Sequence, residues 1–204
     1  MWHESHMTLD GPGLAEAGVR LDFINERHRA VIAQSGATEA MWNWMPVMPE
    51  GTSFNAYFDF ILAEARAGRM VPFTIFRESD GAFAGVISYM NIFRTHRRLR
   101  IGYRWHPEGM NTGLVPAAVS LAMIRRAHEC RFQRLEFLVN VGNKGTIAAV
   151  ESLGAQKEGV LRRFQRNASG LWGDVAIYSL VGTEIDLTVD ALSDQVRALQ
   201  SAQA

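Results

Sequence analysis

The sequence lacks most of the features on which secreted and membrane-spanning proteins depend. Cys130 is the single cysteine among 204 residues. This excludes a disulfide framework and fits a reducing compartment, so we expect a cytoplasmic location. No stretch approaches the ~18 consecutive apolar residues of a membrane span, and we expect no membrane association. Residues 1–13 lack the basic and apolar blocks of a secretory signal, and we interpret them as a loose leader.

An excess of charge of one sign is also lacking. The 21 Lys and Arg side chains balance 21 Asp and Glu side chains, so no nucleic acid is expected as the main partner. His3, Glu4 and His6 do not have the spacing of a helical HExxH motif, and we expect no metal. With 48% apolar and 21% charged residues, the chain resembles an ordinary soluble globular protein that needs no disulfide or metal to fold.

What the sequence does contain is a regular succession of strand and helix patterns. Strands are predicted at 18–23, 71–77, 85–93, 99–105, 132–139, 158–165 and 173–181, and helices at 25–34, 37–44, 53–68, 113–129, 143–154 and 189–200. Strands flanked by helices on both sides of a mixed sheet indicate the α/β class. Without an internal repeat or linker, we expect one domain at 14–186, followed by a C-terminal amphipathic helix at 187–204.

The most informative stretch is 140–180. Asn143 is a preferred N-cap, and the hydroxyl of Thr146 lies three positions on, facing the same way. Gly154 is typical of a left-handed helix end, so a short helix is predicted between Asn143 and Gly154. A two-stranded hairpin is predicted to follow it.

This order of features resembles the GNAT superfamily of acetyl-CoA-dependent N-acetyltransferases, in particular the ribosomal-protein N-terminal acetyltransferase-like (RimJ/RimL-type) branch. The matching positions are Asn143, Thr146, Leu153 to Ala155, Glu158, Gly159, Asp174, Tyr178 and Ser179. The resemblance covers about 19–180. It implies the GNAT acyl-CoA N-acyltransferase fold, in which a central mixed, mostly antiparallel sheet has splayed central strands and flanking helices.

The resemblance also places the pyrophosphate of acetyl-CoA at the start of the helix predicted at 113–129. Helix N-termini bind phosphate because free N–H groups and the helix dipole converge there. The loop departs from the family pattern: Met110 replaces a basic or amide residue, and Asn111 replaces a glycine. Thr112, Gly113 and Leu114 complete the predicted cofactor-binding segment. An ordinary loop-to-helix junction is the alternative interpretation.

The strand at 99–105 resembles the family strand whose backbone meets the pantetheine arm, so Tyr103, Trp105 and His106 are predicted to bind the cofactor. Arg100 stands where the family often has a glutamate that accepts a proton from the substrate. A guanidinium stays protonated and cannot act as that base. Arg100 is therefore predicted either to contact an acidic acceptor or to pair with a surface carboxylate.

Three residues are candidate catalytic groups. Glu136, on the strand at 132–139, and His106 are the candidate bases. The resemblance assigns to Thr146 the position of a serine near the cofactor sulfur, which makes it the candidate proton donor to the thiolate. It assigns to Asn143 a contact with the cofactor. Helix capping by both residues is the alternative, and Tyr178 is expected in the core or lining the pocket.

The acceptor pocket is expected between the first helices and the strands opposite the cofactor. Trp42, Trp44 and Tyr89, together with Arg100, are predicted to line it. Aromatic side chains suit an apolar acceptor or a peptide end. Ordinary core packing is the alternative for each aromatic residue.

These observations lead to one main hypothesis and two rivals. The main hypothesis is acetyl transfer from acetyl-CoA to a primary amine, either a protein N-terminus or a small molecule, by direct attack. The first rival is a catalytically weak or inactive acyl-CoA-binding protein with the same fold, which Met110 and Arg100 favour. The second is a different acyl donor, with Leu114 and Val115 reshaping the pocket. The apolar sheet edge and C-terminal helix make a homodimer a further expectation.

Overall fold

The computed structural model describes residues 8–11, 13–35, 44, 53–167 and 170–202. Within these residues the strands form one eight-stranded sheet in the order β1-β2-β3-β4-β5-β6-β8-β7. Neighbouring strands run antiparallel except β5 and β6, which run parallel. The strands are β1 Leu14–Glu16, β2 Val19–Phe23, β3 Met70–Arg77, β4 Phe83–Phe93, β5 Arg98–Trp105, β6 Arg134–Asn140, β7 Gln156–Arg166 and β8 Trp172–Val181.

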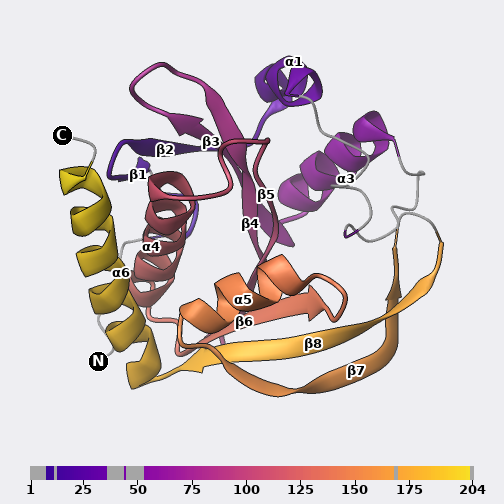
Figure 1. Ribbon diagram of the computed structural model, residues 1–204. Coiled ribbons are helices and arrows are strands. Elements are labelled where there is room, and N and C mark those ends of the chain that lie inside the picture. The colour runs from indigo at the N-terminus through magenta and orange to yellow at the C-terminus, as the bar shows by residue number, and fades with distance from the viewer. Residues whose placement is uncertain (1–7, 12, 36–43, 45–52, 168–169, 203–204) are drawn as a thin grey trace.

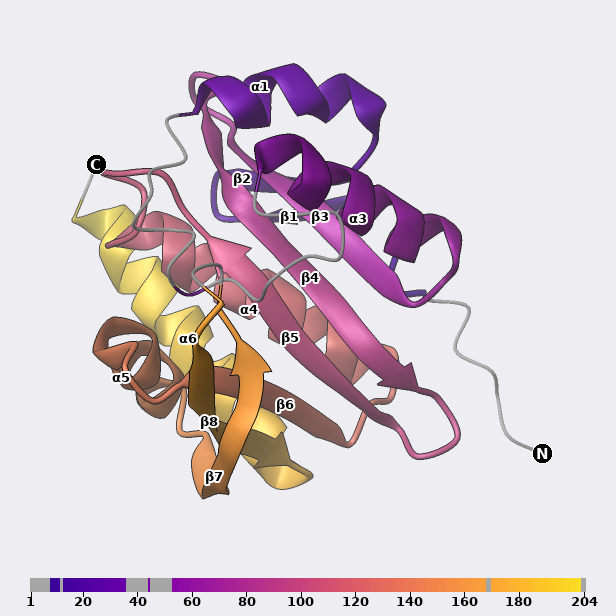
Figure 2. The same cartoon turned by 90° about the vertical axis from the view of Figure 1, so that its right-hand side faces the viewer.

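Helices cover both faces of this sheet (Figures 1 and 2). α4 and α6 lie side by side on one face, and α1 and α3 lie on the other. α5 follows β6 directly in the chain and packs beside it. The helical elements are the 3₁₀ turn η1 Glu26–His28, α1 Arg29–Gln34, α3 Phe54–Arg66, α4 Leu114–Glu129, α5 Lys144–Ser152 and α6 Thr183–Ser201.

Each face of the sheet has its own apolar core. The larger core joins α4, α6 and one face of the sheet, and includes Leu99, Leu135 and Leu192. The smaller one joins α1 and α3 to the opposite face through residues such as Ile32 and Phe58. Because side chains alternate along a strand, β5 and β6 contribute to the larger core only through every second residue. The two faces of the sheet therefore present different side chains, one set to each core.

The central feature of the sheet is the short contact between β5 and β6. These strands pair only from Arg98↔Arg134 to Arg100↔Glu136, although β5 continues to Trp105 and β6 to Asn140. Beyond Arg100 the strands separate, and no strand of the described residues pairs with their facing backbone edges. The predicted mixed, mostly antiparallel sheet with splayed central strands is confirmed.

Two irregularities in β4 and β5 shape this opening. The β4–β5 register shifts twice, at Asn91 in β4 and at Tyr103 in β5, and both residues have positive φ, of 49° and 48°. Such bulges bend a strand and re-aim its side chains. Gly85 permits the close approach of the end of β5, because a Cβ at this position would lie 2.3 Å from the Trp105 carbonyl oxygen.

The segment borders differ from the prediction at both ends of the chain. Residues 8–11 belong to the segment predicted as a loose leader, yet Leu9 is fully buried and Arg126 donates to the Thr8 carbonyl at 3.1 Å. The predicted border at 186/187 falls inside α6, which begins at Thr183.

The helix predicted at 37–44 lies outside the described residues except for Trp44. None of the helices among the described residues is long and apolar enough to cross a bilayer.

Candidate active site

A groove of about 1140 Å³ passes through the opening between β5 and β6. On one side of the sheet it is lined by Phe60 and Glu64 of α3, and on the other by Thr146 and Ala149 of α5. The floor comes from β5 and β6 themselves, and the groove extends along the loop before α4 to Asn111. It therefore connects the two faces of the sheet, as a site that joins two substrates requires.

The start of α4 offers free backbone donors. Its N-cap Gly113 has φ 74° and ψ −138° and no side-chain cap, and the first turn carries no acidic residue. Among the described residues, no backbone acceptor receives the N–H groups of Gly113, Leu114 or Val115. Unpaired amides at the positive end of a helix dipole fit a diphosphate. The residues present thus suit the phosphates of acetyl-CoA.

The other loop residues of the predicted cofactor segment are placed differently. Asn111 lines the groove, whereas Met110 and Leu114 are half-buried against the larger core. Arg77 of β3 donates to the Met110 sulfur at 3.7 Å. A cation therefore lies beside the position where the family pattern has a basic or amide side chain. Thr112 is exposed and is not part of the groove wall.

The start of α5 forms the opposite wall. The Asn143 side chain accepts a hydrogen bond from the Thr146 backbone N–H at 3.1 Å, which confirms the predicted cap. The Thr146 side chain is exposed and lines the groove. Asn140, which the sequence analysis did not select, accepts from the Gly142 N–H at 2.9 Å and also lines the groove. Both asparagine side chains thus hold the backbone of the turn that presents Thr146.

His106 is part of the groove wall but is not arranged as a base. Its Nδ1 lies 2.7 Å from the Ala84 carbonyl oxygen, and its Nε2 accepts from Arg104 Nε at 3.1 Å. Burial, followed by the nearby charge of Arg104, lowers the pKa of His106 to about 3. Nδ1 therefore carries the proton, and both ring nitrogens are engaged. The prediction of His106 as a candidate base is wrong on this geometry, while its backbone remains at the groove.

Arg104, whose backbone was predicted to meet the pantetheine arm with that of its neighbours, is a half-buried cation whose side chain the prediction had not used. It donates to the Ser120 hydroxyl at 3.0 Å and to the Pro116 carbonyl at 3.2 Å, both in α4. Burial lowers the pKa of Arg104 to about 10. Its charge lies beside the first turns of α4 and adds to the positive potential there.

Glu136 is bound in ion pairs and does not line the groove. Its Oε1 accepts from Arg134 Nε at 2.9 Å and from Arg98 Nη1 at 3.4 Å, and the side chain is only 7% exposed. Two arginine side chains occupy one oxygen of this carboxylate, which is held away from the groove wall. The geometry favours a structural role, and the predicted catalytic role of Glu136 stays a prediction.

The predicted acceptor residues separate into two groups. Trp44 and Arg100 line the groove, and the Trp44 ring lies against Gly142, where an added Cβ would be 3.0 Å away. Tyr89 does not, because it is fully buried and donates to the Met123 carbonyl of α4 at 2.6 Å. Its assignment to the acceptor pocket is corrected to the larger core. Trp42 lies outside the described residues.

Aromatic side chains build the wall on the α3 side. The Tyr103 ring centroid lies 6.2 Å from that of Phe60 and 6.4 Å from that of Tyr57. Burial, then the nearby carboxylate of Glu64, raises the pKa of Tyr103 to about 12. Trp105 also lines the groove, with its ring 5.3 Å from Phe83. Phe60 and Glu64 of α3 were not predicted as groove residues, although a helix was predicted at 53–68.

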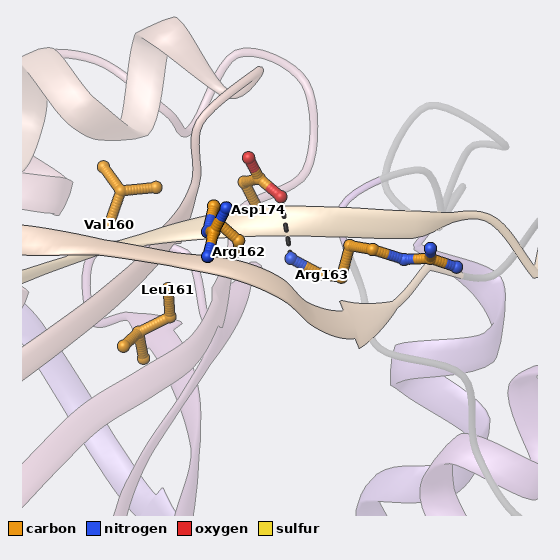
Figure 3. A pocket seen from close by; sticks show the side chains of 5 residues that line it. All are labelled: Val160, Leu161, Arg162, Arg163 and Asp174. Carbon is orange, nitrogen blue, oxygen red and sulfur yellow. Dashed lines mark hydrogen bonds between the residues drawn. The ribbon is translucent and has the colours of Figure 1, made fainter.

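The hairpin residues that resemble the family motif make structural contacts. Glu158 is paired with Arg134 and accepts from the Ser179 hydroxyl at 2.7 Å, and Tyr178 donates to Glu151 at 2.9 Å. Asp174 accepts from the Arg163 backbone N–H at 2.7 Å, across the bulge of β7 (Figure 3). Asp174 and Arg163 also line a shallow hollow beside β7, outside the groove between β5 and β6 (Figure 3). Among the described residues, no group of His, Cys, Asp or Glu has a metal-binding arrangement.

Solved structures identify the architecture. The GCN5-related N-acetyltransferase from Brucella melitensis aligns with a TM-score of 0.80 at 16% identity, covering 90% of this chain and 85% of that one. RimJ from Mycobacterium smegmatis, solved in complex with CoA-disulfide, aligns with a TM-score of 0.71 at 23% identity, covering 90% and 93%. Together with the opened strand pair, these likenesses show the GNAT fold.

The family follows from the sequence comparison. The family model described as an acetyltransferase (GNAT) domain matches residues 19–156, and the chain belongs to this family. The Bacillus subtilis protein named "Probable N-acetyltransferase YjcK" is 28% identical over 113 residues, which cover 55% of this chain and 62% of that protein. The chain thus spans less than two thirds of the length of the curated relatives it matches.

Proposed function

We propose that this protein transfers the acetyl group of acetyl-CoA to a primary amine by direct attack. One observation carries the proposal: the groove crosses the sheet where β5 and β6 part, beyond the Arg100↔Glu136 pair. An acyl donor that enters from the α4 and α5 side and an amine that enters from the α3 side would meet at the same gap. Family membership supports this reading.

The residues of the chain divide the chemistry between them. The free N–H groups from Gly113 to Val115 bind the phosphates, and the unpaired edge of β5 binds the pantetheine arm through backbone hydrogen bonds. The amine lone pair attacks the thioester carbonyl carbon, the C–S bond breaks, and the Thr146 hydroxyl donates a hydrogen bond to the leaving sulfur. The proton lost by the amine ends on that sulfur, directly or through water.

Positioning supplies most of the rate enhancement in this proposal. A free α-amine has a pKa of about 8 and is partly neutral at physiological pH. A dedicated base then raises the rate by less than the alignment of the two reactants does, because the effective concentration of aligned reactants can reach ~10⁵–10⁸ M. His106 is engaged through both ring nitrogens and Glu136 is ion-paired. The geometry therefore fits attack by an amine that loses its proton to water.

Calorimetric titration with acetyl-CoA, followed by mass spectrometry of an amine panel, tests the proposal. We expect acetyl-CoA to bind in the micromolar range and at least one primary amine to gain a single acetyl group. Binding without turnover on peptides, amino acids, polyamines or other amines would instead support the rival of a non-catalytic acyl-CoA-binding protein. Absence of acetyl-CoA binding would contradict both.

We also propose self-association through the β7–β8 hairpin. Large apolar side chains are exposed along it, with Val160 and Leu161 on opposite sides of β7 (Figure 3): Val160, Leu161, Phe164, Leu171 and Trp172. Exposed apolar surface of this kind often marks an interface. Light scattering on wild type and on a Phe164→Ser variant tests this, and a wild-type monomer at micromolar concentration would contradict it.

A further inference from the structure

Arg100 occupies the point where the groove begins. It is the last residue of β5 that pairs with β6, opposite Glu136, and it pairs with Met90 of β4 on its other side. Its neighbours Leu99 and Ile101 belong to the larger core on the α4 side. Because strand side chains alternate, the guanidinium of Arg100 lies on the opposite face, where α3 packs. This is the acceptor side of the opening and not the side of the α4 N-terminus.

The charge of Arg100 is not matched by a partner within the described part of the chain. Its Nε is buried without a hydrogen-bond acceptor, and no ion pair of Arg100 is found among the described residues. The adjacent Glu136 already accepts from Arg134 and Arg98. Burial lowers the pKa of Arg100, although Glu136 partly opposes this. A half-buried cation in such a position is costly unless a ligand supplies the counter-charge.

The other cations of the groove wall are occupied. Arg69 forms an ion pair with Glu64, and Arg104 donates to Ser120 and the Pro116 carbonyl. His106 is neutral because its pKa is lowered to about 3. Among the described residues that line the groove, Arg100 is thus the cation whose guanidinium has neither an ion pair nor a hydrogen bond. Its planar guanidinium can donate two parallel hydrogen bonds to a carboxylate.

We propose that the acceptor is an amine that also carries a carboxylate close to its nitrogen, and that Arg100 binds this carboxylate. The inference rests on the proposed acetyl transfer and specifies its substrate class. Two sources offer this chemistry: free amino acids, and peptides whose first residue is acidic. In either case Arg100 selects the acceptor and orients the amine toward the opening, where the donor thioester would lie.

Paired acceptors isolate the contribution of the carboxylate. Each amino acid is compared with its carboxamide, and each peptide that starts with Asp or Glu is compared with its Asn or Gln counterpart. We expect wild type to favour the carboxylate in kcat/KM by tenfold or more in one of the two sets, which identifies the source. In Arg100→Gln the ratio should fall to about one, because the carboxylate then loses the cation that distinguishes it from the carboxamide.

Two further variants separate recognition from general charge. Arg100→Lys keeps the charge without the planar fork, and should retain part of the preference. Arg98→Gln removes a cation from the same strand outside the groove wall, and should retain the full wild-type ratio. A wild-type ratio near one, or an unchanged ratio in Arg100→Gln, would overturn the proposal.

A binding readout distinguishes failure of this inference from failure of the proposed function. N-acetylated forms of the panel, as carboxylates and carboxamides, are titrated against wild type and Arg100→Gln by thermal shift without donor. Carboxylate-dependent stabilisation lost only in Arg100→Gln would support the inference even if turnover were absent. Turnover without any carboxylate preference would support the function and contradict the inference. The melting temperature of unliganded Arg100→Gln should equal or exceed that of wild type, whereas a merely structural arginine would give a lower one.

Discussion

At the scale of single residues, the backbone conformation of Gly113 restricts the residue type most strongly. Its φ of 74° and ψ of −138° lie in a region that glycine alone occupies readily, and the added Cβ would meet open space. Gly113→Asp therefore strains the loop and places a negative charge at the proposed phosphate site. We expect the Kd for acetyl-CoA to rise at least about tenfold, or ~1.4 kcal/mol, in calorimetric titration. Gly81→Asp, also at positive φ in open space, is the control, and equal losses in both variants would contradict the placement.

Thr146 allows capping and chemistry to be separated. The cap uses the Thr146 backbone N–H, so removing the hydroxyl leaves that hydrogen bond intact. In Thr146→Ala we expect kcat to fall by about tenfold or more, with the Kd for acetyl-CoA within about twofold of wild type. Thr146→Ser, which restores a hydroxyl, should recover most of the rate in steady-state kinetics. Wild-type kcat in Thr146→Ala would remove this side chain from the mechanism.

Local chemistry explains which residues could be predicted from the sequence. Asn143 caps α5 as its residue type and position indicate, because a cap depends on atoms three residues apart. The hydrogen bonds of His106 involve Ala84 and Arg104, and the pKa of Arg100 is affected by Glu136. Ala84 and Glu136 are distant in sequence, and the direction of the Arg104 side chain depends on the fold. Sequence spacing contains no information on such contacts. Tyr89 was misplaced for the same reason, since its face of β4 could not be determined from residue type.

At the scale of elements, the end of β5 depends on a glycine in the neighbouring strand. Gly85 has φ 141°, and a Cβ there would lie 2.3 Å from the Trp105 carbonyl oxygen and 2.8 Å from His106 Nδ1. The Trp105 backbone cannot move aside as easily as the end of a flexible side chain can. Gly85→Ala should therefore lower the free energy of unfolding by about 1–3 kcal/mol. Gly102→Ala is the control, since its Cβ would meet only Met90, at 3.5 Å. Denaturant unfolding measures both, and equal stability of the two variants would contradict this role of Gly85.

Hydrophobic periodicity predicted most strands and helices to within a few residues, because alternation and helical spacing are local properties. The bulges at Asn91 and Tyr103 were not predicted, since neither residue signals positive φ as a glycine would. The separation of β5 from β6 was expected from the family resemblance alone. It follows from pairing that stops at Arg100, a feature of two strands about 35 residues apart in sequence.

At the scale of the whole molecule, His106 links folding to pH. Burial lowers its pKa to about 3 from the ordinary value of 6.5, so between these values the unfolded chain binds a proton and the folded chain does not. The contribution to stability is fully present above pH 6.5 and is lost as pH falls through this window. As the pH falls through this window, we expect the protonation of His106 to lower the free energy of unfolding by up to about 1.4 kcal/mol per pH unit.

A His106→Asn variant should show a shallower decrease of stability from pH 6.5 towards 4, measured by urea unfolding at each pH. Its absolute stability can differ from wild type, because the histidine hydrogen bonds are lost, but the slope is the diagnostic quantity. His96→Asn, in the exposed turn between β4 and β5, is the matched control. Parallel curves for wild type and His106→Asn would contradict the buried neutral histidine.

Segments outside the family match are part of the main core. Leu9 and β1 precede the match and α6 follows it, and Leu9, Leu14, Ile185 and Leu192 all belong to the larger cluster. Of these residues, Leu9 lies in the predicted leader and Leu192 in the predicted C-terminal helix. Residues 187–204 were predicted as a C-terminal amphipathic helix of polar-rich composition. Side-chain burial against α4 depends on the tertiary fold and could not be inferred from that composition.

This packing predicts that the described chain unfolds as one unit. Leu192 is 5% exposed, so Leu192→Ala should lower the free energy of unfolding of the whole domain by about 2–5 kcal/mol. Leu187, on the same helix and 68% exposed, is the matched position, and Leu187→Ala should change stability by no more than about 0.5 kcal/mol. Tryptophan fluorescence and far-ultraviolet circular dichroism should report coincident transitions in all three proteins. If α6 were an independent appendage, Leu192→Ala would reduce helical signal alone and leave the fluorescence transition where it is in wild type.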